Sequence, residues 1–459
     1  MLHIAIDLGS SNGRVFLGRF HGQEPELVEA HRFANAPVFQ AGHWRWDWPY
    51  LRSEIRLGMR KAAEIAGKDR IASIGCCSWA QDFVMLDANG APLENPVYYR
   101  DELTRGLPQA FADVISSKDL VKRVGCCVSP ITALCKLKAM HDHCPELLQK
   151  TKTILHLADM VHFDLCGRAV TDWSLATSGQ MFNISKQEWD FDLLERLDIP
   201  VHILPPVVAK PSVIGSISPA LSPHPALNNV KVVSTVHHDT SCATAVLRPL
   251  AAGTFFISMG SYAMPGLVLN SAQWPIGADP AEYSLIGIAE RQWALFAGCA
   301  GLWIIQECCR LWQKEGRHAD YEHLAQLAGK STYQGVIDLN APHFSKPANM
   351  VAEIKKTCRE AGLAEPKEIG DISKLVFDSL AAGFESSIHG LEKTGQTPCK
   401  KLFLIGGGSR NKCLVRRIEE RIGCEIAAGP AEAAAIGNLM LQKEVLKRTR
   451  KLSTFNAQL

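Results

Sequence analysis

Apolar and polar residues alternate in two stretches of the chain, each containing a cluster of small residues. In the first, residues 3–8 and 15–20 are strand-like runs around residues 9–13, which read Gly-Ser-Ser-Asn-Gly. In the second, 253–266, an apolar and aromatic run ends in Gly-Ser. Both patterns predict β-hairpins with tight turns. Their similarity predicts two domains of related build, and turns rich in glycine let backbone N–H groups approach an anion closely.

Other stretches predict helices and a strand-to-helix junction. Apolar residues recur at helical spacing over 46–61 and over 118–143. An apolar run at 231–236 predicts a buried strand, and the Ala-rich stretch 241–247 after it predicts a helix. Asp239 falls at this junction, where a carboxylate can act as a rigidly held helix cap.

A third glycine turn lies late in the chain. Residues 401–405 predict a buried strand, 406–408 are three glycines, and 412–422 predict a helix. Such a unit places helix N–H groups and bare backbone beside a ligand. The glycines do not fit G-x-G-x-x-G, and G-x-x-x-x-G-K-[ST] is absent from the sequence, so neither a Rossmann dehydrogenase nor a P-loop enzyme is indicated. Taken alone, each glycine turn is more often a simple tight connection.

Composition narrows the function classes. The chain has 459 residues and a formal net charge of +2, from 49 Lys plus Arg against 47 Asp plus Glu. This balance argues against a nucleic-acid-binding protein, because basic residues concentrate only at 443–451. The length predicts two or three domains. The longest apolar stretch, 294–305, falls short of the roughly 20 residues that span a bilayer, so we expect no membrane partner.

The cysteines and the start of the chain predict a cytoplasmic protein. The 15 cysteines show no regular spacing, and we interpret them as buried residues in a reducing compartment. No signal-like apolar run with a basic flank precedes Asp7. Residues 140–144 contain potential metal ligands, but no second cluster at metal-site spacing accompanies them, which argues against zinc. Trp44, Trp46 and Trp48 alternate as packing residues of a half-buried strand would.

Several short motifs become specific through their order along the chain. They are Asp-x-Gly-Ser-Ser at 7–11, His-Arg-Phe-Ala-Asn at 31–35, Trp-Asp at 46–47, Ser-Trp-Ala-Gln-Asp-Phe-Val at 78–84, Tyr-Arg-Asp at 99–101, His-Asp-Thr at 238–240, Gly-Leu-Trp at 301–303 and Gly-Pro-Ala-Glu-Ala at 429–433. This set covers nearly the whole chain and resembles the FGGY carbohydrate kinases. The resemblance implies an α/β fold with two actin-like (ribonuclease H-like) ATPase domains flanking a cleft. It also implies an N-terminal domain over 1–248, a C-terminal domain over 249–440 and a basic tail over 441–459.

The same resemblance implies a site for ATP and Mg²⁺ in the cleft. Asp7 would hold the metal, a role that suits a carboxylate beside phosphate oxygens. The residues implied to bind the nucleotide are Gly9, Ser10, Ser11, Asn12, Gly13, Arg14, Ser261, Gln306, Gly407, Gly408 and Asn411. Ser261 replaces the threonine usual in the second phosphate turn, and its hydroxyl is retained.

Asp239 matches the catalytic base of the family. Phosphoryl transfer to an alcohol needs a group that accepts the hydroxyl proton as the new bond forms, and one positioned carboxylate suffices. A plain helix-capping role is compatible with this assignment. The implied sugar-binding residues are Ala80, Gln81, Asp82, His238, Asp239, Thr240 and Gly298.

The motifs come closest to family members that act on L-rhamnulose, with departures around the sugar. Those members usually have Trp-Gly-Val-Asp where this chain has Trp-Ala-Gln-Asp at 79–82. They usually have Asn where Gly298 stands, and Thr-Asn-Ala-Thr-Thr-Thr-Gln where this chain has its own segment at 171–180. We therefore expect ATP-dependent phosphorylation of a primary hydroxyl of a ketose, with L-rhamnulose as the leading substrate and L-rhamnulose 1-phosphate as its product.

Three alternatives remain open at this point. The first is another FGGY kinase acting on L-fuculose, a ketopentose or a polyol. The second is a catalytically silent sugar or nucleotide sensor, and the third is an actin-like interaction protein that binds nucleotide. We expect a monomer or small homo-oligomer whose partners are the sugar and ATP.

Overall fold

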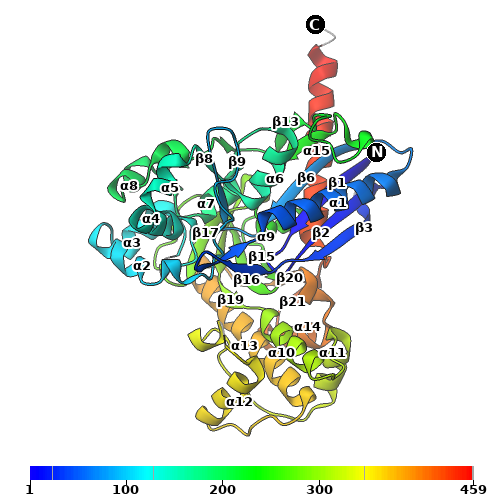
Figure 1. The fold of residues 1–459 in the computed structure, drawn as a ribbon. Coiled ribbons are helices and arrows are strands. Elements are labelled where there is room, and N and C mark those ends of the chain that lie inside the picture. The colour runs from blue at the N-terminus through cyan, green and yellow to red at the C-terminus, as the bar shows by residue number, and fades with distance from the viewer. Residues whose placement is uncertain (23, 128, 346, 457–459) are drawn as a thin grey trace.

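Two β-sheets form the centres of two domains (Figure 1). The computed structural model describes residues 1–22, 24–127, 129–345 and 347–456. The first sheet runs in the order β13 (Ser212–Ser216), β14 (Lys231–Ser234), β6 (Ile71–Ser78), β1 (Leu2–Leu8), β2 (Asn12–Phe20) and β3 (Pro25–Ala34). The second runs in the order β17 (Tyr283–Gly287), β18 (Trp293–Ala297), β16 (Tyr262–Leu269), β15 (Phe255–Met259), β20 (Lys401–Ile405) and β21 (Glu425–Ala428), with β19 (Cys299–Ala300) paired to β16. We call each sheet, with the elements packed on it, the first and the second domain.

The two sheets share one plan. In the first, β1 pairs antiparallel with β2 and parallel with β6. In the second, β15 pairs antiparallel with β16 and parallel with β20. Both predicted hairpins are confirmed, as are the strand at 401–405 and the helix at 412–422. The turns of both hairpins occupy corresponding places in their sheets, which allows them to meet across the space between the domains.

Helices cover both sheets, and short elements fill the connections. The helices of the first domain are α1 (Trp48–Ala66), α2 (Leu107–Ala110), α3 (Ser117–Val124), α4 (Ala133–His143), α5 (Pro145–Lys150), α6 (Leu157–Cys166), α7 (Trp173–Ser178), α8 (Phe191–Arg196) and α9 (Asp239–Ala243). Those that follow are α10 (Trp303–Lys314), α11 (Tyr321–Lys330), α12 (Met350–Glu360), α13 (Ile369–Gly395), α14 (Lys412–Ile422) and α15 (Ala433–Asn456). Short strand pairs are β4 (Pro37–Gln40) with β5 (His43–Trp46), β7 (Phe83–Leu86) with β8 (Thr153–His156), β9 (Thr171–Asp172) with β12 (Val207–Val208), and β10 (Phe182–Asn183) with β11 (Glu188–Trp189). Single 3-10 turns span Glu102–Thr104, Phe111–Asp113, Val201–Ile203, Pro225–Leu227, Thr244–Val246, Ala289–Arg291, Pro342–Phe344 and Gly407–Arg410.

The structure corrects the sequence-based elements at two places. The helical pattern over 118–143 is two helices, α3 and α4, because Gly125 ends α3 with a φ of +74° and Thr132 caps α4 through Cys135 N. The alternating tryptophans do not share one strand, since Trp46 ends β5 and Trp48 begins α1. None of the helices in the described ranges combines the length and apolarity needed to cross a membrane.

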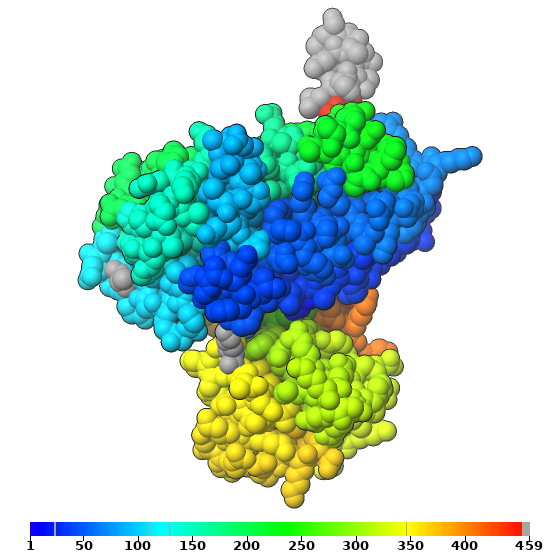
Figure 2. All heavy atoms as spheres, viewed as in Figure 1, coloured from blue at the N-terminus to red at the C-terminus, as the bar shows by residue number. Residues whose placement is uncertain are grey.

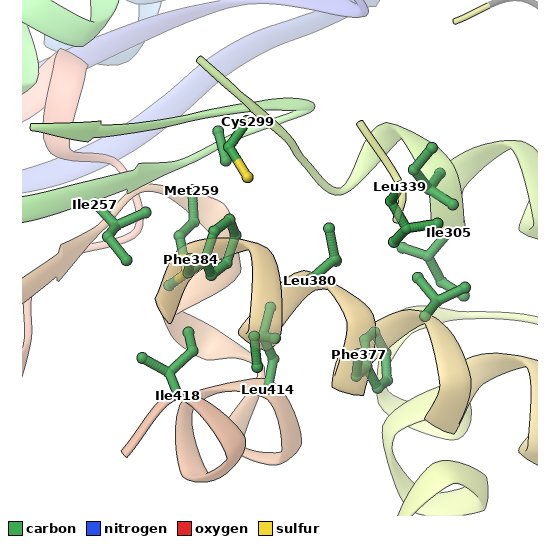
Figure 3. Close-up of a cluster of buried hydrophobic side chains, with 14 of the residues drawn as sticks. Ile257, Met259, Cys299, Ile305, Leu339, Phe377, Leu380, Phe384, Leu414 and Ile418 are labelled. Atoms are coloured by element: carbon green, nitrogen blue, oxygen red, sulfur yellow. The ribbon is translucent and has the colours of Figure 1, made fainter. Parts of the chain in front are cut away.

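The core of the second domain supports the turn between β15 and β16. Helix α13 buries Phe377, Leu380 and Phe384, which are spaced three and four residues apart and therefore lie on one face. Figure 3 shows this face between the side chains of α14 and those of β15, including Met259 at the end of β15. The hairpin turn that follows Met259 thus rests on tightly packed side chains.

Helix α15 links the second domain to the first sheet. It follows β21 in the chain and then runs along the first sheet, projecting at the top of Figure 1. There the Gln442 amide donates to Ile4 O at 2.9 Å and accepts from Ser73 Oγ at 2.6 Å. The expected boundary at residue 440 falls inside this helix, and residues 457–459 of the expected tail lie outside the described residues.

Figure 2 shows a smaller lobe, coloured yellow-green to yellow, below a wider body, and α15 packs against α9 within that body. Where α15 passes α9, Gly437 faces the backbone of Cys242, and a Cβ atom at Gly437 would lie 2.2 Å from Cys242 O. Only a residue without a side chain fits this approach, because the neighbouring atom is backbone and cannot rotate away. The position of α9 therefore depends on how closely the backbone of α15 can approach it.

We predict that Gly437→Ala lowers the free energy of unfolding by about 1–3 kcal/mol, because overpacking outweighs the gain in helix propensity. The matched control is Gly329→Ala in α11, where a Cβ atom would meet nothing within 4 Å. This control should keep or slightly raise stability in urea denaturation. Equal stability of the two variants would contradict the close packing of α15 on α9.

Candidate active site

One cleft of about 1520 Å³ gathers residues from both domains. The structure brings 17 of the sequence-predicted site residues to its wall: Asp7, Gly9, Ser10, Ser11, Asn12, Arg14, Ala80, Gln81, His238, Asp239, Thr240, Ser261, Gly298, Gln306, Gly407, Gly408 and Asn411. The two predicted residues that do not line the cleft are Gly13 and Asp82. Residues more than 400 positions apart in sequence thus share one wall.

The two hairpin turns face each other across this cleft. Ser11 Oγ and Ser261 Oγ lie 3.3 Å apart, and Ser261 Oγ donates to Gln306 Oε1 at 3.0 Å. Gly9 N donates to Asn12 O at 2.9 Å, which closes the first turn tightly. Hydroxyls and short backbone turns therefore meet where the domains approach, an arrangement suited to an anion held between them.

The residues of the late glycine turn have different structural roles. Gly406 has a φ of +87°, the left-handed region that glycine adopts without strain. Gly408 packs against the second turn, since a Cβ atom there would lie 2.7 Å from Met259 Cβ, whereas Gly407 meets nothing within 4 Å. Asn411 caps α14 by accepting from Leu414 N at 3.1 Å. Gly407 thus offers the bare backbone surface of this turn to the cleft.

Asp7 and Arg14 stand opposite each other on β1 and β2 and form an ion pair at 2.5 Å. Arg14 also contacts Glu432, which the sequence analysis noted within a motif but did not assign to the site. Arg14 is therefore held between two carboxylates from opposite ends of the chain. This pairing fixes the guanidinium beside the first turn.

Asp239 is the first residue of α9, and His238 occupies the N-cap position, so the expected capping role of Asp239 is wrong by one residue. Its Oδ1 accepts from Thr240 N at 2.5 Å and lies 3.6 Å from His238 Nε2. Burial, together with the negative charge of Asp7, raises the pKa of Asp239 to about 7. Burial likewise lowers the pKa of His238 to about 4, so this neighbour is neutral at pH 7.

A buried polar network holds the segment that leads to Asp239. Ser78 N donates to His237 O at 2.7 Å, and His238 N donates to Ser174 Oγ at 3.0 Å. The His237 ring bonds to Asp159 Oδ1 at 2.6 Å. Burial opposes protonation of His237, but the Asp172 and Asp159 carboxylates raise its pKa. The backbone on both sides of His237 is thus fixed by β6 and α7, which orients Asp239.

Asp82, which was expected to contact the sugar, lies behind the cleft wall. It is 0% exposed, forms a buried ion pair with Lys136 and accepts from Trp46 Nε1 at 2.5 Å and from Trp79 Nε1 at 2.8 Å. A carboxylate with these partners has no face left for a ligand. Sequence alone could not reveal this, because Lys136 lies 54 residues away on α4.

Two further expectations change in the structure. Gly13 does not reach the cleft, and its role is packing, since a Cβ atom there would lie 2.1 Å from the Phe33 ring. Gln81 lines the cleft, but its amide is bound to backbone: Nε2 donates to Ser178 O at 2.9 Å and Oε1 accepts from Ala133 N at 3.1 Å. Gln81 thus joins β6 to α4 and α7 at the wall. Its φ of +78° is unusual for a residue with a side chain.

Comparison with known proteins agrees with this geometry. The model of the N-terminal domain of the FGGY carbohydrate kinases matches residues 2–245, and the model of the C-terminal domain matches residues 282–443. The chain belongs to the FGGY family of carbohydrate kinases. It is therefore a sugar kinase, an enzyme class that uses ATP.

Curated relatives and solved structures extend the comparison. A rhamnulokinase from Oceanobacillus iheyensis is 31% identical over 440 residues, covering 96% of this chain and 92% of that protein. One from Halalkalibacterium halodurans is 31% identical over 458 residues, covering 98% and 96%. The crystal structure of xylulose kinase from Lactobacillus acidophilus matches with a TM-score of 0.78 at 15% identity, covering 97% and 89%. That of Plasmodium falciparum glycerol kinase with ADP matches with a TM-score of 0.75 at 16% identity, covering 96% and 88%. The structural matches confirm the expected fold class.

We predict that Asp82→Ala lowers the free energy of unfolding by about 3–5 kcal/mol, because it leaves the Lys136 ammonium buried without a counter-charge. Urea denaturation measures this loss. The matched control is Asp142→Ala, which removes the partner of Lys138 on the surface of the same helix and should cost no more than about 1 kcal/mol. A variant with unchanged stability but a raised sugar KM would instead support the sugar-binding role first assigned to Asp82.

Proposed function

We propose that this kinase transfers the γ-phosphoryl group of ATP to a primary hydroxyl of a ketose, with L-rhamnulose as the leading substrate and L-rhamnulose 1-phosphate as the product. The observation that carries the proposal is the raised pKa of Asp239 in a cleft shared with the two hydroxyl-bearing turns. The names of the curated relatives favour L-rhamnulose among ketoses.

The nucleotide side of the cleft is proposed to hold ATP against the hairpin turns. Backbone N–H groups and hydroxyls at residues 9–12 and at Ser261 would face the phosphates, and the late glycine turn with Gln306 would border the rest of the nucleotide. Arg14 would add a cation. In the domain division we propose, 1–248 carries the sugar site and Asp239, and 249–440 carries most of the nucleotide contacts, with 441–459 as a C-terminal extension.

The residues near Asp7 fit a magnesium ion. Its carboxylate oxygens are hard donors of the type that Mg²⁺ prefers, and phosphate oxygens and water would complete the shell. The negative charge of Asp7 raises the pKa of Asp239, so the two carboxylates repel each other and a cation beside Asp7 would relieve that repulsion. When bound, the ion would neutralise charge on the transferring phosphoryl group.

Asp239 is proposed to act as the general base. Its Oδ atoms would accept the proton of the sugar hydroxyl as that oxygen attacks the γ-phosphorus in line with the departing ADP. The network around His237 would keep the carboxylate in place, and Thr240 N would stabilise its ionised form. A silent sensor would need no such base.

A second candidate function is the phosphorylation of a sugar or polyol other than L-rhamnulose. Ala80, Gly298 and the segment 171–180 differ from the pattern typical of L-rhamnulose kinases, which favours testing L-fuculose, ketopentoses and polyols in parallel. ADP release measured across ketoses, aldoses and polyols decides between these acceptors. Failure with every acceptor would contradict the kinase assignment to small sugars.

We predict that Asp239→Asn reduces sugar-dependent ADP release by about 100-fold or more, because the amide cannot accept the hydroxyl proton. ATP affinity, measured by calorimetry, should change little. The control Asp69→Asn removes an exposed carboxylate that pairs with Arg19 and should leave turnover unchanged. Unaltered turnover in Asp239→Asn would rule out this residue as the base.

We also predict that kcat/KM for the sugar falls as the pH drops through about 7. The base must be ionised to act, and Asp239 binds its proton at about pH 7, so each lower pH unit should cost about tenfold. The groups that set this value are Asp7, which raises the pKa, and Arg14 with Thr240, which lower it. Rates from about pH 5 to about pH 9, with MgATP and sugar both well below their KM values so that the free enzyme titrates, measure the profile. A flat profile down to about pH 5 would be the behaviour of an ordinary carboxylate and would contradict the prediction.

A further inference from the structure

Tyr262 lies at the cleft beside the second turn and was not singled out from the sequence. It is the first residue of β16 and follows Ser261, whose hydroxyl points to Ser11 and Gln306. It pairs with Ala300 in β19 and crosses toward Gly298, two residues earlier on the same face.

Gly298 provides the space for the Tyr262 side chain. A Cβ atom at Gly298 would lie 2.2 Å from Tyr262 Oη and 3.3 Å from its Cζ. Any side chain at position 298 would therefore displace the end of the tyrosine ring. The phenol hydroxyl thus occupies the space into which a side chain at position 298 would extend.

The Tyr262 side chain is open to a ligand. It is 53% exposed although both of its sequence neighbours are largely covered, and it lines the same cleft as Asp239 and Gly298. Among the described residues, no hydrogen bond to its hydroxyl is formed. Ile131, 37% exposed, lines the cleft as well. A hydroxyl that can donate and accept thus projects into the cleft, whereas the Gln81 amide in the same wall is bound to backbone groups.

We propose that Tyr262, seated over Gly298, is a specificity-determining residue that binds the sugar acceptor. Its hydroxyl exchanges a hydrogen bond with a hydroxyl of the acceptor, and its ring, held in place by the space at Gly298, limits the size of acceptor that fits. This inference rests on the proposed function, because it assigns the acceptor side of that same cleft. The acceptor class it selects is a small polyhydroxylated sugar with a hydroxyl directed at Tyr262.

Three variants test the pair. Tyr262→Phe keeps the ring and should raise the acceptor KM about two- to tenfold, the effect of one neutral hydrogen bond, with the KM for ATP unchanged. Gly298→Ala should raise the acceptor KM by displacing the ring. The same Gly298→Ala change in a Tyr262→Ala background should have no further effect, because the added methyl group then meets empty space.

Matched controls separate a loss of fold from a loss of recognition. Tyr50→Phe deletes a phenol hydroxyl that bonds to Ala34 O outside the cleft, and Gly22→Ala adds a methyl group where a Cβ atom meets nothing within 4 Å. Both should match the unaltered enzyme in acceptor KM and in thermal unfolding, and the cleft variants should unfold at the same temperature as these controls. An unchanged acceptor KM in Tyr262→Phe and in Gly298→Ala, or additive effects in the double variant, would overturn the inference while leaving the kinase assignment intact. Absence of turnover with every acceptor in the unaltered enzyme would instead overturn the proposed function.

Discussion

The repulsion between Asp7 and Asp239 is the constraint around which the cleft is organised. Two carboxylates in one partly enclosed space cannot both ionise freely, and the structure resolves this unequally. Asp7 pairs with Arg14, whose other side is held by Glu432, whereas burial and the negative charge of Asp7 raise the pKa of Asp239. The cleft thus holds a carboxylate paired with arginine and a second carboxylate with a raised pKa, the two groups on which the proposed phosphoryl transfer depends.

Holding two like charges close together needs a rigid support, and the fold supplies it from two directions. Within the first domain, His237 bonds to Asp159 and its carbonyl accepts from Ser78, so β6 fixes the approach to α9. From the second domain, α15 returns to the first sheet and presses the backbone of Gly437 against α9. The helix that connects the second domain to the first sheet thus also braces the proposed base.

Short sequence patterns correctly predicted elements whose formation depends on neighbouring residues. They failed for side chains whose position depends on residues far away in the sequence. The hairpins, the strand at 401–405 and the position of Asp239 after a strand followed from short periodicities. Asp82 could not be placed, because its buried position depends on Lys136 in a helix that no spacing connects to it. Tyr262 was missed for a related reason: its significance comes from the empty space at Gly298, which is visible only once β16 and β19 are paired.

The two sides of the cleft depend on different kinds of chemical groups. This difference explains why short motifs identify the chain as a kinase more readily than they identify the sugar that it phosphorylates. The proposed phosphate turns offer backbone N–H groups and small hydroxyls, so serine in place of threonine at position 261 would keep their chemistry. The proposed acceptor wall relies on the side chains of Ala80 and Tyr262 and on the missing side chain of Gly298, so one added or removed group would change the shape of the site. At such a wall the shape of the site depends on pairs of residues from neighbouring strands, such as Tyr262 and Gly298, so a motif read along one strand does not define the acceptor.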